Sequence, residues 1–135
     1  MVTHTRIRKF NTKESFPELA LDNDMCQAVR AGNTVFVRGQ VGQTFDHEIV
    51  GVGDVAAQTQ QAMENIDILL KESGSEMSHV CKLIVYLVDP RHREAVYQTI
   101  GPWFKGVYPV STCVVVSMFT RPEFLVEIDV TAVVP

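Results

Sequence analysis

Two hydrophobic runs close the chain, at 111–118 and 124–133, with a short loop between them. In the second run hydrophobic residues alternate with Glu127 and Asp129, and this period of two predicts a strand with one hydrophobic and one polar face. The first run is hydrophobic at both alternating positions, which is typical of a strand that is covered on both faces. The polar face of the last strand therefore meets either water or a cavity closed by another subunit.

Earlier runs predict four more strands, at 6–10, 25–31, 34–38 and 81–88. The first alternates weakly, as an edge strand does, and the last is almost continuously hydrophobic, as a central strand is. Gly32 and Asn33 tolerate positive φ and so predict a hairpin turn between the second and third strands. We interpret 11–24 as an irregular loop and 43–53 as a polar loop.

Hydrophobic residues recur at helical spacing in two segments of the chain. Asp54 is a suitable N-cap for the first helix and Gly74 a suitable stop. Its predicted buried stripe is Thr59, Ala62, Met63, Ile66, Leu69 and Leu70. The second helix should begin at Asp89 and bend or end near Pro102, and its predicted stripe is Val96, Ile100, Trp103 and Phe104.

This order of elements predicts one α/β (α+β) domain over residues 1–135. The simplest arrangement is a single mixed β-sheet with two helices packed on one face. The other face would expose too many Val, Phe and Cys side chains to be stable in water. We therefore expect it to be buried against other copies of the chain.

Composition argues against nucleic-acid binding, membrane insertion and a metal site. A net charge of −4 offers no basic surface for nucleic acid or for a membrane, and no hydrophobic run approaches the roughly 18 residues of a membrane span. The three cysteines are far apart and flanked by hydrophobic residues, which predicts reduced core thiols in a cytoplasmic protein, and the N-terminus lacks the hydrophobic core of a signal peptide. Neither the cysteines nor the four histidines have metal-ligand spacing.

Several strings resemble the RidA/YjgF family. They are QAVRAGNTVFV at 27–37 followed by Gly-Gln at 39–40, DVAAQT at 54–59, VYL at 85–87 and VEIDVTAV at 126–133. The match covers nearly the whole chain from Met25 onward. The resemblance implies a chorismate-mutase-like fold and a homotrimer with ligand clefts between subunits. It also implies hydrolysis of small reactive enamines and imines to keto acids and ammonia, with no metal or organic cofactor.

Four positions depart from the family's site pattern. Ser111 stands where the deaminase branch usually has an Arg that clamps the substrate carboxylate, and a hydroxyl cannot replace a bidentate guanidinium. Met25 aligns with the site tyrosine, Arg38 with a serine, and Tyr97 with the asparagine of the second helix. Ser111 therefore indicates either a changed substrate or a cleft that does no chemistry.

Among the side chains, Cys113 and Glu127 match the pattern directly, and a backbone group of Gly39 is a further candidate contact. In one interpretation Arg38 takes over anion binding, while Glu127 activates the attacking water and passes a proton to the leaving ammonia. In the other, Arg38 is a structural ion-pair partner of Glu127 or Asp129.

Three other candidates rank lower. Cys113 has no histidine near it in sequence, so a cleft-lining role is favoured over that of a nucleophile. Arg93 begins the second helix and could reach the cleft. Arg121, before the last strand, is a reserve candidate for anion binding.

The sequence thus leaves two functions open. One is a deaminase acting on a small enamine or imine, such as an aminomuconate-like catabolic intermediate. The other is a non-catalytic trimer that binds a small anionic metabolite in a regulatory or protective role. A ribonuclease activity, described for some family members, is disfavoured by the charge of −4.

Overall fold

The computed structural model describes residues 4–135. The first three residues of the N-terminus, which the signal-peptide prediction includes, lie outside the described residues. The strands are β1 (His4–Asn11), β2 (Asp24–Ala31), β3 (Thr34–Gln40), β4 (Val80–Leu87), β5 (Val110–Val115) and β6 (Val126–Val133). The helices are α1 (Thr12–Ser15), α2 (Val55–Glu72) and α3 (Arg93–Ile100). Short 3₁₀ turns occupy Met77–His79, Pro90–His92 and Gly101–Phe104.

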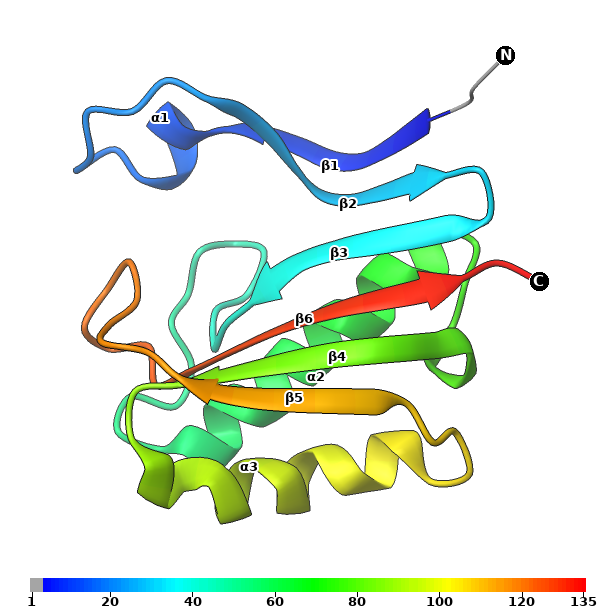
Figure 1. The fold of residues 1–135 in the computed structure, drawn as a ribbon. Coiled ribbons are helices and arrows are strands. Elements are labelled where there is room, and N and C mark those ends of the chain that lie inside the picture. Colours follow the sequence, from blue (N-terminus) through cyan, green and yellow to red (C-terminus); the bar gives the residue numbers. More distant parts are fainter. Residues whose placement is uncertain (1–3) are drawn as a thin grey trace.

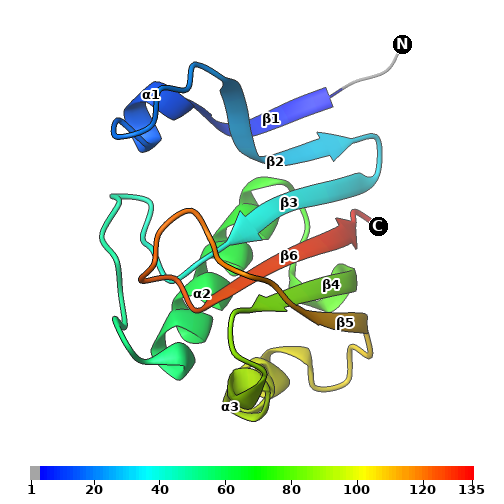
Figure 2. The same ribbon diagram turned by 60° about the vertical axis from the view of Figure 1, so that its left-hand side comes forward.

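All six strands form one sheet in the order β1-β2-β3-β6-β4-β5. Only β4 and β5 run parallel; every other neighbouring pair is antiparallel. The longer helices α2 and α3 lie on one face of this sheet, and Figure 2 shows the same arrangement from a second direction (Figures 1 and 2). The predicted mixed sheet with two helices on one face is therefore confirmed, with β1 at an edge and β4 inside the sheet.

The core lies between the sheet and these helices. The whole predicted stripe of α2 is buried, and β6 alternates as expected, with Val126, Ile128 and Val130 buried and Glu127 and Asp129 half-buried on the other face. The predicted ends of α2 are also confirmed. The Asp54 side chain accepts a hydrogen bond from the backbone N–H of Ala57 at 3.1 Å, and Gly74 follows the helix with φ of +83°.

Three element boundaries were predicted wrongly. The segment 11–24 contains α1, because the Asn11 side chain accepts from the backbone N–H of Lys13 and caps a helical turn. Strand β5 ends at Val115 rather than at 118, because β4, its hydrogen-bonding neighbour, ends at Leu87. Strand β6 begins at Val126 because the preceding backbone N–H donates to a helix side chain instead of to the sheet.

The expectation of core cysteines is wrong for two of the three. All three thiols are free, but Cys81 is exposed and Cys26 is only half-buried, whereas Cys113 is half-buried and packs against the core. Cys81 lies where the pairing of β4 with β6 shifts between Val80 and Lys82, so strand alternation does not turn it inward. Among residues 4–135 no helix is long and hydrophobic enough to cross a membrane.

Candidate functional site

A β-bulge in β3 organises the candidate site. The pairing of β3 with β6 shifts between Val37 and Gln40, so that Arg38 and Gly39 together stand opposite Asp129. The extra residue returns Gln40 to the buried side and leaves Arg38 and Gly39 facing away from the helices. Bulges of this kind often re-aim side chains beside active sites.

Glu127 lies directly against Gly39. A β-carbon built on Gly39 would come within 2.5 Å of Glu127 Oε2, so a glycine is needed for the carboxylate to occupy this place. Burial raises the pKa of Glu127 above its ordinary value, and this effect exceeds the opposing influence of the Arg38 charge. The nearby Asp129 carboxylate raises the Glu127 pKa further. Glu127 is thus a partly desolvated carboxylate of increased basicity.

Arg38 is a cation that has no ionic partner among the described residues. Its guanidinium carbon lies 5.2 Å from the ring centroid of Phe10, and among residues 4–135 the guanidinium forms no hydrogen bond or ion pair. Arg38 is exposed at the surface, yet enough protein surrounds the charged group for burial to lower its pKa, with Glu127 opposing that change. Asp129 instead accepts a hydrogen bond from the hydroxyl of Tyr86 at 2.9 Å. The alternative of a direct structural ion pair is therefore not what the structure contains.

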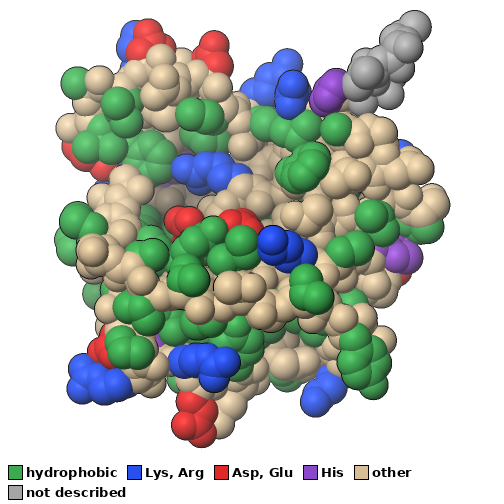
Figure 3. Space-filling model, in the orientation of Figure 1, with side chains coloured by type: hydrophobic (Ala, Val, Ile, Leu, Met, Phe, Trp, Pro, Cys, Tyr) green, Lys and Arg blue, Asp and Glu red, His purple; other side chains and the backbone are tan. Residues whose placement is uncertain are grey.

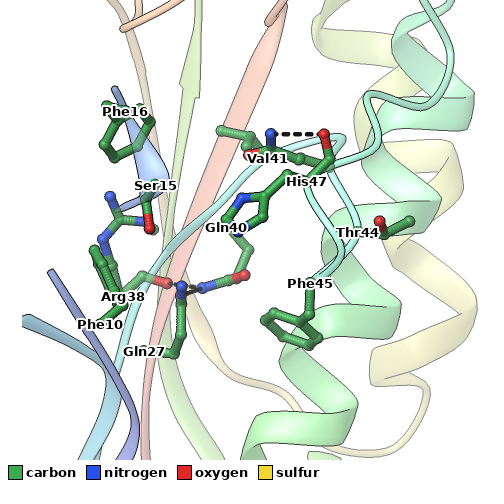
Figure 4. A pocket seen from close by; sticks show the side chains of 12 residues that line it. Phe10, Ser15, Phe16, Gln27, Arg38, Gln40, Val41, Thr44, Phe45 and His47 are labelled. Atoms are coloured by element: carbon green, nitrogen blue, oxygen red, sulfur yellow. Dashed lines mark hydrogen bonds between the residues drawn. The ribbon is translucent and has the colours of Figure 1, made fainter. Parts of the chain in front are cut away.

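Arg38 lies where β2 and β3 separate. β2 pairs with β3 only at 28–31, whereas it pairs with β1 along its whole length, and in Figures 1 and 2 the β1, β2 and α1 segment diverges from the end of β3. Gln40 Nε2 donates to Gln27 Oε1 at 3.0 Å and to the Arg38 carbonyl at 2.9 Å, which bridges the gap (Figure 4). These hydrogen bonds fix the position of the β3 backbone at Arg38.

A small cavity of about 50 Å³ fills this gap. Phe10, Gln27, Arg38 and Gln40 line it, and Figure 4 shows the Arg38 side chain extending toward Ser15. A space of this size holds water molecules but not a metabolite. We therefore expect a ligand of Arg38 to bind on the uncovered face of the sheet.

Ser111 belongs to a second cluster, on the helix-covered side. Ser111 pairs with the buried Leu83 of β4, so both side chains point toward α3. There the hydroxyl groups of Ser111 and Tyr97 form a hydrogen bond of 2.8 Å. Cys113 lies on the same side, half-buried against the core, and the Arg93 guanidinium lies 5.1 Å from the centroid of the Tyr97 ring.

The predicted site residues thus fall into two groups within one chain. Arg38, Gly39 and Glu127 face away from the helices, whereas Ser111, Cys113, Tyr97 and Arg93 lie at β5 and α3. Met25 is 49% exposed on β2, beside a separate surface hollow. Arg121 is engaged elsewhere, in an ion pair of 2.8 Å with Glu18.

Sequence reasoning missed several residues that shape the first group. The side chains of Gln27 and Gln40 form a hydrogen bond between β2 and β3. The guanidinium of Arg38 lies over the ring of Phe10, and the Tyr86 hydroxyl donates a hydrogen bond to Asp129. Gln27, Gln40 and Tyr86 lie within the strings that resemble the RidA/YjgF family, but nothing in the sequence marks their side chains as site contacts, and Phe10 lies outside those strings. Among residues 4–135 no group of three or more His, Cys, Asp or Glu side chains is arranged to hold a metal ion.

The uncovered sheet face combines these charges with exposed hydrophobic side chains. Figure 3 shows acidic and basic side chains next to one another on it, among hydrophobic ones. Phe36 is 51% exposed there, and Val110 and Val114 of β5 are 65% and 39% exposed. Exposed hydrophobic side chains that gather around charged groups are a feature of interaction surfaces.

Comparisons with known proteins agree with this architecture. A family model described as endoribonuclease L-PSP matches residues 18–134. A RutC family protein of Synechocystis is 34% identical over 113 residues, which cover 81% of this chain and 85% of the relative. The 3-aminoacrylate deaminase RutC of Acinetobacter baylyi is 32% identical over 101 residues, 75% of this chain and 79% of that protein. A 2-iminobutanoate/2-iminopropanoate deaminase of Dermatophagoides farinae is 28% identical over 108 residues, 80% and 84% of the two chains.

Solved structures show the same fold. A member of the YjgF/YER057c/UK114 family from Mycobacterium tuberculosis superposes with a TM-score of 0.77 at 27% identity, covering 97% of this chain and 99% of the other. The yeast protein YEO7 superposes with a TM-score of 0.81 at 26% identity, covering 97% and 98%. The relatives include two enamine or imine deaminases, so this chemistry occurs within the family. By the family match over 18–134 and by relatives above 30% identity, the chain belongs to the endoribonuclease L-PSP family, the family of YjgF, RidA and RutC.

Proposed function

We propose that this protein is a homotrimeric hydrolase that deaminates a small carboxylate-bearing enamine or imine in clefts between subunits. The observation that carries the proposal is the pair formed by Glu127 and Arg38. A half-buried carboxylate with a raised pKa lies within the electrostatic influence of a cation that forms no ion pair or hydrogen bond among the described residues. The deaminase names of two relatives supply the reaction class.

The chemistry needs an anion anchor and one group that moves protons. Arg38 binds the substrate carboxylate and so positions the imine carbon near Glu127. The reacting species is the protonated imine. Glu127 removes a proton from water as the water oxygen bonds to the iminium carbon and the C=N electron pair moves to nitrogen, which gives a carbinolamine with OH and NH₂ groups. Glu127 then donates its proton to that nitrogen, the C–N bond breaks as the hydroxyl oxygen forms the C=O bond, and the hydroxyl proton returns to Glu127 as ammonia and a keto acid leave. An enamine enters the same route because protonation at carbon gives this iminium ion directly.

A raised pKa suits this cycle. A carboxylate of ordinary pKa is a weak base for water, and a general acid–base group works best when its pKa lies closer to the working pH. At Glu127 burial moves the pKa in that direction, and the Arg38 charge opposes this change.

The proposal places the cleft between subunits for two reasons. The two groups of site residues lie on different sides of the same sheet, so one chain cannot direct both at one ligand. The face that carries Glu127 also exposes Phe36 and Val114. A neighbouring subunit that covers this face would bury those side chains and could bring its own β5 and α3 to the cleft.

The Phe36→Glu substitution tests the shared cleft. It places a charge in the proposed interface, so light scattering should find monomers, and the specific activity should fall with the loss of trimers. Ile68→Glu is the matched control, because Ile68 is also exposed, at 39%, but lies on α2. A folded Phe36→Glu monomer with wild-type activity would contradict the inter-subunit location.

The reaction itself is tested by release of ammonia and keto acid from a freshly generated 2-aminoacrylate-type imine. We expect the wild-type protein to accelerate release well above the rate in buffer. A rate equal to that in buffer would exclude generic imine deamination. Ser111 favours the second candidate function, a non-catalytic trimer that binds a small anionic metabolite. That function predicts saturable binding of a keto acid in calorimetry without any turnover.

A further inference from the structure

We infer that the groove between α3 and β5 binds a large hydrophobic, aromatic-sized substituent of the substrate. The preferred imine would then derive from an amino acid such as phenylalanine rather than from alanine. This inference rests on the proposed deamination, since it assigns the part of the substrate that points away from the reacting carbon. It concerns the residues at β5 and α3 around Ser111, which have no part in the proton transfers of the proposed reaction.

The groove is large enough for such a substituent. It is open to solvent on one side and offers about 360 Å³. An engineered hydrophobic cavity of roughly 150 Å³ in another protein holds benzene, so a phenyl ring fits here with room to spare. Its lining is mainly hydrophobic and includes Leu83, Ile100, Phe104 and Pro109. Hydrophobic walls with few polar groups are typical of sites for apolar parts of ligands.

The polar groups in the groove do not form an anion site. The hydroxyls of Ser111 and Tyr97 bond to each other at 2.8 Å, so one hydroxyl hydrogen is used within the pair. Ser111 also leaves free the volume that an arginine would fill at this position of the strand. Lys105 lines the groove as well, but its side chain is exposed on the loop after the 3₁₀ turn. The charge for the substrate carboxylate is supplied instead by Arg38.

Tyr108 adds an aromatic ring to the rim. It is 90% exposed and its φ is +58°, a left-handed conformation that is uncommon for a bulky residue. Strained residues of this kind concentrate at ligand-binding and other functional positions. A planar substituent in the groove could stack on this ring, which would account for an exposed tyrosine on a strained backbone.

Binding of keto-acid products tests the inference without requiring turnover. Calorimetry would compare phenylpyruvate, pyruvate and 2-oxoglutarate on the wild-type protein. We expect phenylpyruvate to bind at least about tenfold more tightly than pyruvate, because burial of a phenyl group favours binding. Stronger binding of 2-oxoglutarate than of phenylpyruvate would overturn the inference, because it would show that Lys105 or another cation makes the groove an anion site.

Two substitutions test the groove itself. Ser111→Arg fills it with a charged side chain and Ser111→Leu with a neutral one. Both should weaken phenylpyruvate binding about tenfold or more while leaving pyruvate binding within about twofold of wild type or tighter. Gln98→Arg is the control, since Gln98 is an exposed residue of α3 that does not line the groove. Equal losses for both ligands in the Ser111 variants would contradict the inference.

Turnover separates this inference from the proposed function. Imines generated by an amino-acid oxidase from phenylalanine and alanine would be compared by ammonia release. Faster release from the phenylalanine-derived imine supports both. Faster release from the alanine-derived imine overturns the groove assignment and leaves deamination standing. If neither imine reacts faster than in buffer, the proposed function fails, and preferential phenylpyruvate binding still supports the groove.

Discussion

Glu127 and Gly39 are in such close contact that no other amino acid at position 39 would leave the carboxylate where it is. A β-carbon there would meet Glu127 Oε2, the side-chain carboxyl carbon and Cγ at 2.5, 2.7 and 2.9 Å. The bulge that contains Gly39 also presents Arg38. One local irregularity of β3 therefore sets the positions of both charged groups.

Gly39→Ala should consequently displace the Glu127 carboxylate. The φ of Gly39 lies outside the left-handed region, so the backbone can accept alanine and the protein should fold. We expect kcat to fall about tenfold or more, because small misplacements of a catalytic group are costly. Glu64→Ala is the control, since Glu64 is an exposed residue of α2, away from both groups of site residues. Unchanged kcat in Gly39→Ala would show that this contact does not matter.

The raised pKa of Glu127 predicts a pH-dependent cost in stability. Because the folded protein holds this proton more tightly than the unfolded chain, ionising Glu127 destabilises the fold. The cost is absent below the ordinary pKa, grows as pH rises through the folded pKa, and is complete above it. Glu127→Gln should thus be more stable than wild type toward urea at neutral pH, and the gain should disappear near pH 4, below the ordinary value of about 4.3. Glu64→Gln, on the exposed side of α2, is the matched variant. A gain that is the same at both pH values would contradict this reading of Glu127.

Arg38→Ala should change both substrate binding and the pH profile. Loss of the carboxylate anchor should raise KM about tenfold or more. The Arg38 charge lowers the pKa of Glu127, so its removal should move the acid limb of the kcat/KM profile to higher pH. Lys71→Ala removes a surface charge of α2 that pairs with Asp67, and it serves as the control. Full activity with an unshifted profile would rule out Arg38 as the anion-binding group.

Gln58 of α2 forms hydrogen bonds to the segment just before β6, the strand that contains Glu127. Its Nε2 donates to the carbonyls of Gly51 and Glu123 at 3.0 and 2.8 Å, and its Oε1 accepts from the Leu125 N–H at 2.9 Å. Gln58→Ala would leave these backbone groups unpaired in the interior, so we expect the free energy of unfolding to fall by about 3 kcal/mol. Denaturation of Gln98→Ala, which loses only an exposed bond to Glu94, provides the comparison. A change below about 1 kcal/mol would mean that water replaces these bonds.

The elements were predictable where one periodicity dominates. The alternation of β6 and the stripe of α2 each have a single hydrophobic face, and both were assigned correctly. Boundaries failed where a side chain takes over a backbone hydrogen bond, as Gln58 does before β6 and Asn11 does before α1. Such bonds join segments far apart in the sequence or replace a loop with a turn, so hydrophobic patterns do not contain them.

The candidate site was predictable only in part. Glu127 was assigned to the polar face of the last strand from alternation alone. The side on which Ser111 lies depends on the parallel register of β5 with β4, and a strand that is hydrophobic at both alternating positions does not determine that register. The bulge at Arg38 and Gly39 is also invisible in the pattern, because it adds one residue without changing the composition of the strand.

The central claim is that Glu127 carries the proton transfers of an imine hydrolysis. Its most direct test is the kcat for ammonia release from a freshly generated 2-aminoacrylate-type imine by wild type and by Glu127→Gln, both assayed as the oligomer found in solution. Glutamine keeps the size of the side chain and cannot exchange the proton, so we expect kcat to fall about 100-fold or more while keto-acid binding is retained. A Glu127→Gln protein that keeps the wild-type kcat would contradict the account.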